Sequence, residues 1–327
     1  MAGEDNGTAN RERTHVATLH IYALNQPKVL FEQRPVQFPT KKAQELLYFL
    51  LVHAGEVLER DLVAERLWPM CLPKKSHHSL ATALWRLRES LPTPIDHECS
   101  YLSIRQNAIG FNKTASYWFD AETFEQQATC GLKGSLPLDQ PRLQALESAV
   151  ELYRSDFLAG CWADWCLAKR EQLQLLLVRV LKRLQCHSRH NGAFEAAIAY
   201  GQRLLALDPL LEEVHRELMR CYAAAGQRPL ALAQFQCCQD ILQQELHTAP
   251  MPQTTHLYHQ IQDGHYPSDD PAMIEGIVAA DPTSLNALLD YFCRTLDSLE
   301  PTWQLLRATA NAYRRQREYD RAQSQQG

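Results

Sequence analysis

The residue types best suited to chemistry gather in one cationic segment near residue 80. No Asp or Glu occurs between Arg66 and Arg88. The cations and histidines of the segment are Lys74, Lys75, His77, His78, Arg86 and Arg88. Lys and Arg bind phosphates, and polar side chains along a helix read base edges in the major groove. The segment therefore predicts binding to double-stranded DNA. The alternative is a solvated basic helix on an ordinary enzyme or scaffold.

Leucine spacing predicts how this segment is presented. The apolar positions from Leu80 to Leu91 share one face of a helix expected over 76–91. With that face turned inward, the outward side chains are His78, Thr82, Trp85, Arg86 and Glu89. A loop is expected over 69–75, so that Lys74 and Lys75 precede the helix. Two β-like runs at 99–104 and 108–111 predict a hairpin whose turn presents Arg105 to a phosphate or to the neighbouring minor groove.

The net charge of −5 opposes DNA binding only as an average. Residues 1–113 hold 14 Lys and Arg against 12 Asp and Glu, a charge of +2. The rest of the chain holds 19 against 26, a charge of −7. Charges separated by more than about 8–10 Å are screened at physiological salt, so the acidic remainder does not cancel a local positive field.

The elements before and after the cationic segment differ in kind. Runs at 17–23 and 28–31 predict a small antiparallel sheet, and helices are expected from about Ala43 to Gly55 and over 58–68. Beyond residue 113 the chain is helical, and Gly192 and Gly226 lie 34 residues apart, the period of tetratricopeptide helix pairs. Helices at 143–158 and 168–190 are expected to complete the stack, which typically forms a binding surface.

Several ordered motifs resemble one family. The N-terminal ones are Lys41–Leu51, Val57–Leu62, Leu67-Trp68 and Ser79–Arg88, and the later ones are Tyr117–Glu125, Leu211–Gln227 and Leu242–Leu246. Together they resemble the bacterial antibiotic-regulatory-type (SARP-like) transcriptional activators. The resemblance implies a mainly α chain: an N-terminal α+β winged helix followed by an α-helical tetratricopeptide-like repeat, the bacterial transcriptional activator domain (BTAD). It places the family's helix arginines on Arg86 and Arg88.

The remaining contacts follow from the same resemblance and from the outward face. Family contacts before and at the helix start fall on Lys74, Lys75, His78 and Ser79, and the wing falls on 105–111. The predicted DNA-binding set is Lys74, Lys75, His78, Ser79, Thr82, Trp85, Arg86, Arg88 and Arg105. Base preference does not transfer, because Ile109-Gly110 replaces the wing's Gly-Tyr pair of many relatives and Trp85 replaces a smaller or basic residue. Arg88 contacts DNA or packs on its own domain.

Other chemistry finds little support. His77-His78 lack further ligands at metal-site spacing, and no phosphate-binding glycine loop or G-x-S-x-G elbow occurs, so no metal, cofactor or catalytic residue is predicted. The ten cysteines are expected to be reduced and mostly buried. The adjacent residues Cys237 and Cys238 are expected in a helix, where a core position is favoured over a redox switch. Cys161 and Cys166 are expected to pack a helix junction, with thiol sensing as the open alternative.

The sequence thus predicts a non-enzymatic transcription regulator, an activator by resemblance. The expected parts are a disordered tail (1–14), a winged-helix domain (15–113), the BTAD (114–265) and a C-terminal helical extension (266–327). Expected partners are double-stranded DNA, RNA polymerase or other transcription machinery, and a second copy bound through the repeat domain. No membrane span or secretory signal is found, which predicts a cytoplasmic protein. The competing hypothesis is an interaction scaffold whose winged helix binds protein.

Overall fold

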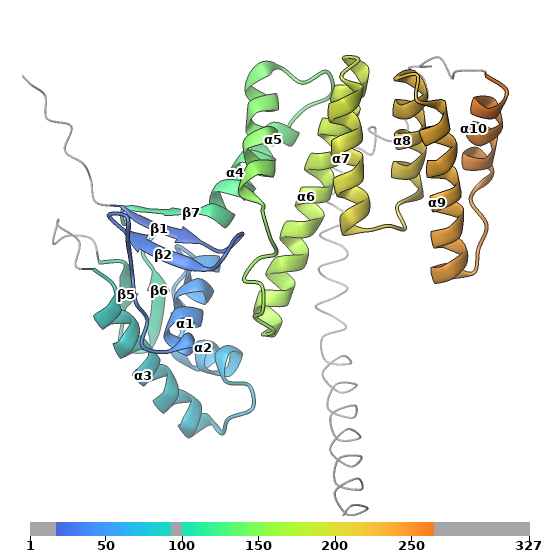
Figure 1. Ribbon diagram of the computed structural model, residues 1–327. Coiled ribbons are helices and arrows are strands. Elements are labelled where there is room, and N and C mark those ends of the chain that lie inside the picture. The colour runs from blue at the N-terminus through green and yellow to red at the C-terminus, as the bar shows by residue number, and fades with distance from the viewer. Residues whose placement is uncertain (1–17, 93–99, 265–327) are drawn as a thin grey trace, which may run out of the picture. The chain divides into compact units, whose positions relative to one another are not determined.

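The computed structural model describes residues 18–92 and 100–264. The predicted tail at 1–14, the start of the predicted hairpin at Cys99 and the predicted extension at 266–327 lie outside these residues. Figure 1 shows the described elements from β1 to α10. The order of these elements confirms the predicted fold class, an α+β N-terminal part followed by a stack of helices.

The N-terminal sheet has four strands in the order β3-β2-β1-β7 (Figure 1). Its members are β1 Leu19–Tyr22, β2 Lys28–Phe31, β3 Arg34–Pro35 and β7 Tyr117–Phe119. The predicted strands at the N-terminus are confirmed, and β1 alternates so that Leu19 and Ile21 are fully buried. The fourth strand was not predicted: β7 pairs with β1 in parallel, with Leu19 opposite Tyr117.

Three helices and a second sheet complete this part of the chain. The helices are α1 Lys41–Val52, α2 Arg60–Leu67 and α3 Pro73–Ser90, and the sheet is β4 Leu58–Glu59, β6 Ala108–Phe111 and β5 Leu102–Ile104. Thr40 begins α1, and its hydroxyl accepts a hydrogen bond from the Ala43 N–H. The predicted helix over 58–68 is partly wrong, because residues 58–59 pair with β6.

The predicted loop over 69–75 is also wrong at its end. Helix α3 begins at Pro73, three residues earlier than expected. Proline suits the first position of a helix because its missing N–H would have no intrahelical partner there. Lys74 and Lys75 therefore lie in the first turn of α3.

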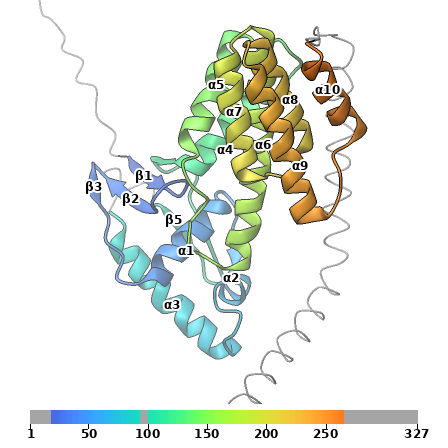
Figure 2. The same ribbon diagram turned by 45° about the vertical axis from the view of Figure 1, so that its right-hand side comes forward.

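Within the described part of the chain, seven helices form the repeat stack. They are α4 Asp120–Leu132, α5 Gln140–Leu152, α6 Asp164–His190, α7 Phe194–Leu207, α8 Glu212–Ala224, α9 Arg228–Leu246 and α10 Pro252–Gln262. Neighbouring helices pack in pairs, α4 on α5, α6 on α7 and α8 on α9 (Figures 1 and 2). Gly192 and Gly226 follow α6 and α8 with φ of 72° and 75°. A left-handed position favours glycine. Because such a position follows the first helix of each of these two pairs, the two glycines repeat with the 34-residue period of the pairs.

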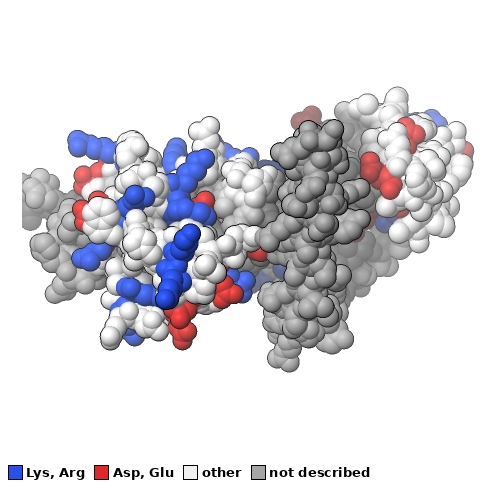
Figure 3. Space-filling view, turned by 90° about the horizontal axis from the view of Figure 1, so that it is seen from below, with Lys and Arg blue, Asp and Glu red and all other residues white. Residues whose placement is uncertain are grey.

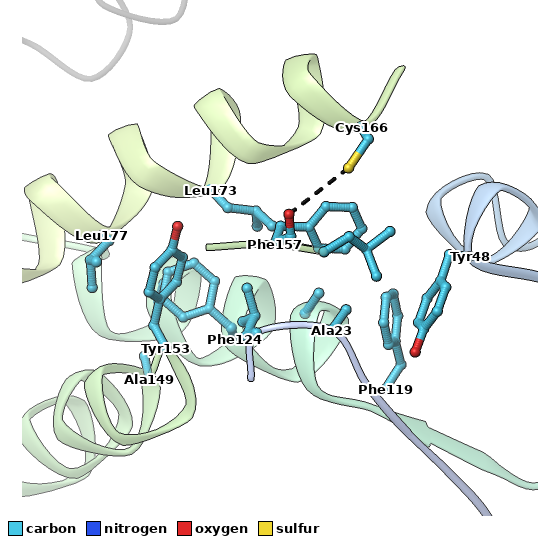
Figure 4. Close-up of a cluster of buried hydrophobic side chains, with 14 of the residues drawn as sticks. Ala23, Tyr48, Phe119, Phe124, Ala149, Tyr153, Phe157, Cys166, Leu173 and Leu177 are labelled. Carbon is cyan, nitrogen blue, oxygen red and sulfur yellow. Dashed lines mark hydrogen bonds between the residues drawn. The ribbon is translucent and has the colours of Figure 1, made fainter. Parts of the chain in front are cut away.

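One hydrophobic cluster runs from the first sheet into the helical stack. Figure 4 shows Phe124 of α4, Tyr153 and Phe157 of the α5–α6 connection, and Leu173 and Leu177 of α6 packed together. Tyr48 of α1 and Phe119 of β7 continue the cluster in the same view.

Hydrogen bonds reinforce this continuity. The backbone N–H groups of Ala23 and Leu24 donate to the Asp120 carboxylate, and the N–H of Ser155 donates to the Leu24 carbonyl at 2.9 Å. The N–H of Leu158 donates to the Ala23 carbonyl at 2.9 Å. The segment after β1 is therefore held by both α4 and the α5–α6 connection.

Candidate nucleic-acid interface

Helix α3 is anchored by its apolar face. Leu80, Ala83, Leu84 and Leu87 are buried, and α3 packs on α1 and α2. The Ser76 hydroxyl is buried and donates to the Pro73 carbonyl at 2.9 Å, which closes the first turn. The predicted leucine stripe thus fixes which face of α3 points away from the protein.

The predicted contact residues differ in exposure. Lys74, Lys75, His78, Trp85 and Arg88 are exposed. Ser79, Thr82 and Arg86 are half-buried at the margins of the outer face. The Thr82 hydroxyl donates to the His78 carbonyl at 3.0 Å, so this proton is already committed within the helix. Trp85 is 62% exposed in the middle of the helix, an unusual position for a large aromatic side chain.

The cations of this region face little opposing charge. Lys74, Lys75, Arg86, Arg88 and Arg105 form no ion pair with any residue in 18–92 or 100–264. Figure 3 views the molecule from below and shows Lys and Arg side chains spread over this end of the surface, with fewer Asp and Glu. One acid lies close to the first turns of α3: the Asp61 carboxylate is 3.5 Å from the His77 ring. The sequence did not single out Asp61.

The hairpin beside α3 is built as predicted, with a turn at 105–107. The Arg105 N–H donates to the Ala108 carbonyl at 2.8 Å, and Ile104 pairs with Ile109. Arg105 is exposed at this turn. The structure brings it to the tip of a hairpin attached to β4, and the N–H of Arg60 at the start of α2 donates to Asn107 at 3.0 Å.

Packing explains the Ile109-Gly110 pair. Ile109 is fully buried, and Gly110 lies against the backbone of the β4 side. A Cβ atom at position 110 would lie 2.3 Å from the Glu56 carbonyl oxygen. Only glycine fits this close approach, a requirement that local sequence does not reveal.

Other kinds of functional site find less support among the described residues. Among the described residues, no group of three His, Cys, Asp or Glu side chains could hold a metal ion. A hollow between α1 and α4 is lined by Lys169 and Glu125, but these two pair with each other at 2.6 Å. No described helix is long and apolar enough to cross a membrane.

The prediction that cysteines are mostly buried is wrong. Of the eight described thiols, Cys166, Cys221 and Cys238 are buried. Cys237, beside the buried Cys238, is exposed. Adjacent helical side chains point about 100° apart, which explains the different exposure of this pair.

Comparison with known proteins gives three results. Residues 119–262 match the family described as the bacterial transcriptional activator domain. The transcriptional regulatory protein MoaR1 of Mycobacterium tuberculosis is 22% identical over 243 residues, which cover 68% of this chain and 72% of MoaR1. The structure of M. tuberculosis EmbR, in complex with a low affinity phosphopeptide, aligns with a TM-score of 0.65 and 16% identity, over 83% of this chain and 71% of EmbR. The EmbR likeness shows a shared fold.

Proposed function

We propose that this chain, a transcriptional regulator of the antibiotic-regulatory (SARP-like) type with a bacterial transcriptional activator domain, binds specific duplex DNA through α3 and the β5–β6 hairpin. Helix α3 would occupy the major groove and the hairpin would lie beside it as the wing. The observation that carries this proposal is the outward face of α3, whose cations have no acidic partner among the described residues.

Each predicted residue has a role in this proposal. Lys74 and Lys75, in the first turn of α3, would contact phosphates and set the register of the helix on the duplex. Their position also places them at the positive end of the α3 macrodipole, which favours phosphate binding. His78 and Ser79 would lie near the same end of the groove.

The remaining residues lie further along α3 or on the wing. Arg86 would contact a base edge or a nearby phosphate, and Trp85 and Thr82 would offer apolar groups to the bases. Arg88 is exposed, which supports contact with DNA over packing on its own domain. Arg105 at the wing turn would reach a phosphate or the neighbouring minor groove.

The test is a titration of full-length protein against duplexes selected from a random library. Arg86→Ala should weaken specific binding by about 1–3 kcal/mol, as expected for one base-edge or close phosphate contact. Arg179→Ala, which removes an exposed arginine of α6, is the matched control and should leave the affinity unchanged. Circular dichroism of each variant checks that the fold is intact. An unchanged affinity for Arg86→Ala at fixed salt would refute this assignment.

Salt dependence separates DNA binding from the competing scaffold function. Each phosphate contact should lower the logarithm of the binding constant by about 0.9 per log unit of salt. Exposed Met70 and Leu72, in the loop before α3, favour a protein partner for this region as the second candidate. Binding to duplex DNA that is absent or insensitive to salt would support that scaffold function.

We also propose that the repeat domain mediates self-association and contact with RNA polymerase or other transcription machinery. Exposed apolar side chains on the stack support this proposal: Leu175, Leu207, Leu230, Leu246 and Met251. Activation, rather than repression, is supported by the description of the matching family. Light scattering over a range of protein concentrations tests self-association, and a constant monomer mass would contradict it.

A further inference from the structure

We propose that Arg142, Arg179 and Arg183 form a binding site for a small phosphate ester, on the helical stack where the loop between α4 and α5 meets α6. We call these three residues the arginine cluster. The loop spans 133–139, and α4 and α5 both pack beside α6 (Figure 1). Because the site belongs to the stack and not to α3, the proposal does not depend on the proposed DNA binding.

The first observation is the geometry of two guanidinium groups at this loop. The Arg142 Nη1 donates to the Ser135 carbonyl at 3.0 Å, and its Nε donates to the Gly131 carbonyl at 3.4 Å. The Arg183 Nη2 donates at 3.3 Å to the carbonyl of Gly134, the residue before Ser135. A Cβ atom built on Gly134 would lie 3.6 Å from the Arg142 Nη1. Carbonyls of adjacent residues therefore hold one guanidinium from α5 and one from α6 at the same point of the loop.

The second observation is that each of these two groups keeps a donor unused. The Arg142 Nη2 and the Arg183 Nη1 are buried, and neither has a hydrogen-bond partner among residues 18–92 and 100–264. A buried donor without a partner is costly, and more so on a charged group. An oxyanion at this point of the loop could accept from both donors and remove the cost. Each side chain as a whole is only half-buried, which leaves an approach from solvent for a small ligand.

The third observation is an excess of positive charge around the cluster. Arg179 is exposed and lies four residues before Arg183, on the same face of α6. No Asp or Glu occurs in residues 172–190. The acid of the loop, Asp139, accepts the Arg142 backbone N–H at 3.0 Å and thereby caps α5. Within the described ranges, no member of the arginine cluster forms an ion pair.

The like charges of the cluster oppose one another. Burial, together with the positive charges of Arg142 and Arg179, lowers the pKa of Arg183. A bound anion relieves this repulsion. A phosphate monoester carries a charge of about −1.5 to −2 at neutral pH and three acceptor oxygens, whereas a carboxylate carries a single negative charge. Three guanidinium groups therefore match a phosphate ester better than a carboxylate, and the forked geometry of guanidinium suits phosphate oxygens.

Inorganic phosphate is the probe for the first test, applied to the full-length protein at constant ionic strength. A ligand that binds the folded state raises the melting temperature as its concentration increases. Arg183→Gln removes a charged donor, so the phosphate concentration needed for the same rise should increase about tenfold or more. Arg154→Gln, which changes an exposed arginine of the α5–α6 connection, is the matched control and should respond like the wild type.

The comparison between variants isolates the arginine cluster. Phosphate stabilises many proteins without a specific site, and it could also bind at α3. Both effects are the same in the wild type, Arg183→Gln and Arg154→Gln, so they cancel in the difference. An equal response of Arg183→Gln and the wild type would overturn the proposal.

Chemical modification of arginine gives an answer even where a variant fails to fold. Phenylglyoxal reacts with accessible guanidinium groups, and peptide mass mapping identifies the residues that have reacted. Inorganic phosphate should slow the modification of Arg179 and Arg183 in the wild type and leave that of Arg154 unchanged. Equal rates at Arg179 and Arg183 with and without phosphate would refute the site.

The same protection assay identifies the carrier of the phosphoryl group. Glycerol 3-phosphate should protect Arg179 and Arg183 at least as well as inorganic phosphate, as expected for a site that takes a small ester. Stronger protection by a phosphoserine peptide would indicate a protein partner and overturn the assignment to a small molecule. A loss of duplex affinity in Arg183→Gln would also overturn it, since the bound phosphates would then be those of DNA.

Discussion

Replacement of Asp120 by asparagine should change how the stability of this protein depends on pH. Asp120 is 2% exposed. Its Oδ2 accepts the N–H groups of Ala23 and Leu24 at 2.8 Å each, and its Oδ1 accepts Ala23 again at 2.9 Å. Burial raises the pKa of this carboxyl to about 6, against the opposing effect of the backbone N–H groups.

The size of the effect follows from the displacement of the pKa. The pKa rises from 3.8 to about 6 on folding. One pKa unit corresponds to about 1.4 kcal/mol, so the full displacement is equivalent to about 3 kcal/mol. Because the folded state binds the proton more tightly, this stabilisation is present below pH 3.8 and is lost as the pH rises through 6.

The comparison that isolates this residue is the wild type against Asp120→Asn. The free energy of unfolding of the wild type, minus that of the variant, should fall by about 2–3 kcal/mol between pH 4 and pH 7. Tyr48 does not interfere, because burial and the Asp120 charge raise its pKa well above the ordinary tyrosine value. Urea unfolding at constant salt, measured at pH 4, 5, 6 and 7, gives the difference.

Asp240→Asn removes an exposed carboxylate of α9 and controls for the loss of one charge. A difference between wild type and Asp120→Asn that is constant with pH would refute the reasoning. A difference that grows with pH would also refute it, since it would mean that the N–H groups stabilise the carboxylate more than burial destabilises it.

Further predictions concern the β5–β6 hairpin and helix α3. Gly110→Ala brings a Cβ within 2.3 Å of the Glu56 carbonyl oxygen, so thermal denaturation should show a loss of stability of about 1–3 kcal/mol; a melting temperature equal to that of the wild type would contradict this close approach. Exposed Trp85 should contact thymine methyl groups. Replacing thymine by uracil in the selected duplex should weaken the wild type and leave Trp85→Ala unaffected, and an equal loss in both would exclude this contact.

Long apolar periodicities predicted most of the helices. The spacing from Ala43 to Leu51 corresponds to α1, and the leucines of 80–87 correctly gave the buried face of α3. The short strands β4 and β7 were missed because two or three residues carry no periodicity of their own. Their strand character comes from partners far away in the chain, β6 and β1. The start of α3 was missed because proline was interpreted as a helix breaker.

In the candidate site too, features that follow from local periodicity were predictable, and features imposed by distant parts of the chain were not. The outward face of α3 follows from its inward leucines, so exposure of His78, Trp85 and Arg88 was predictable. The need for Gly110 was not predictable, because it comes from the backbone of Glu56, which lies before β4 and far from Gly110 in the sequence.

The parallel pairing of β7 with β1 has a consequence for the order in which the chain folds. Ala23 and its acceptor Asp120 are 97 positions apart, and contacts of such long range form slowly because a large loop must close first. During synthesis, β1 therefore leaves the ribosome long before the strand that flanks it exists. We expect a nascent chain that ends at Lys113 to keep an open sheet edge at β1, with the Ala23 and Leu24 N–H groups lacking their carboxylate. Completion of the N-terminal sheet thus awaits the first turn of the repeat stack.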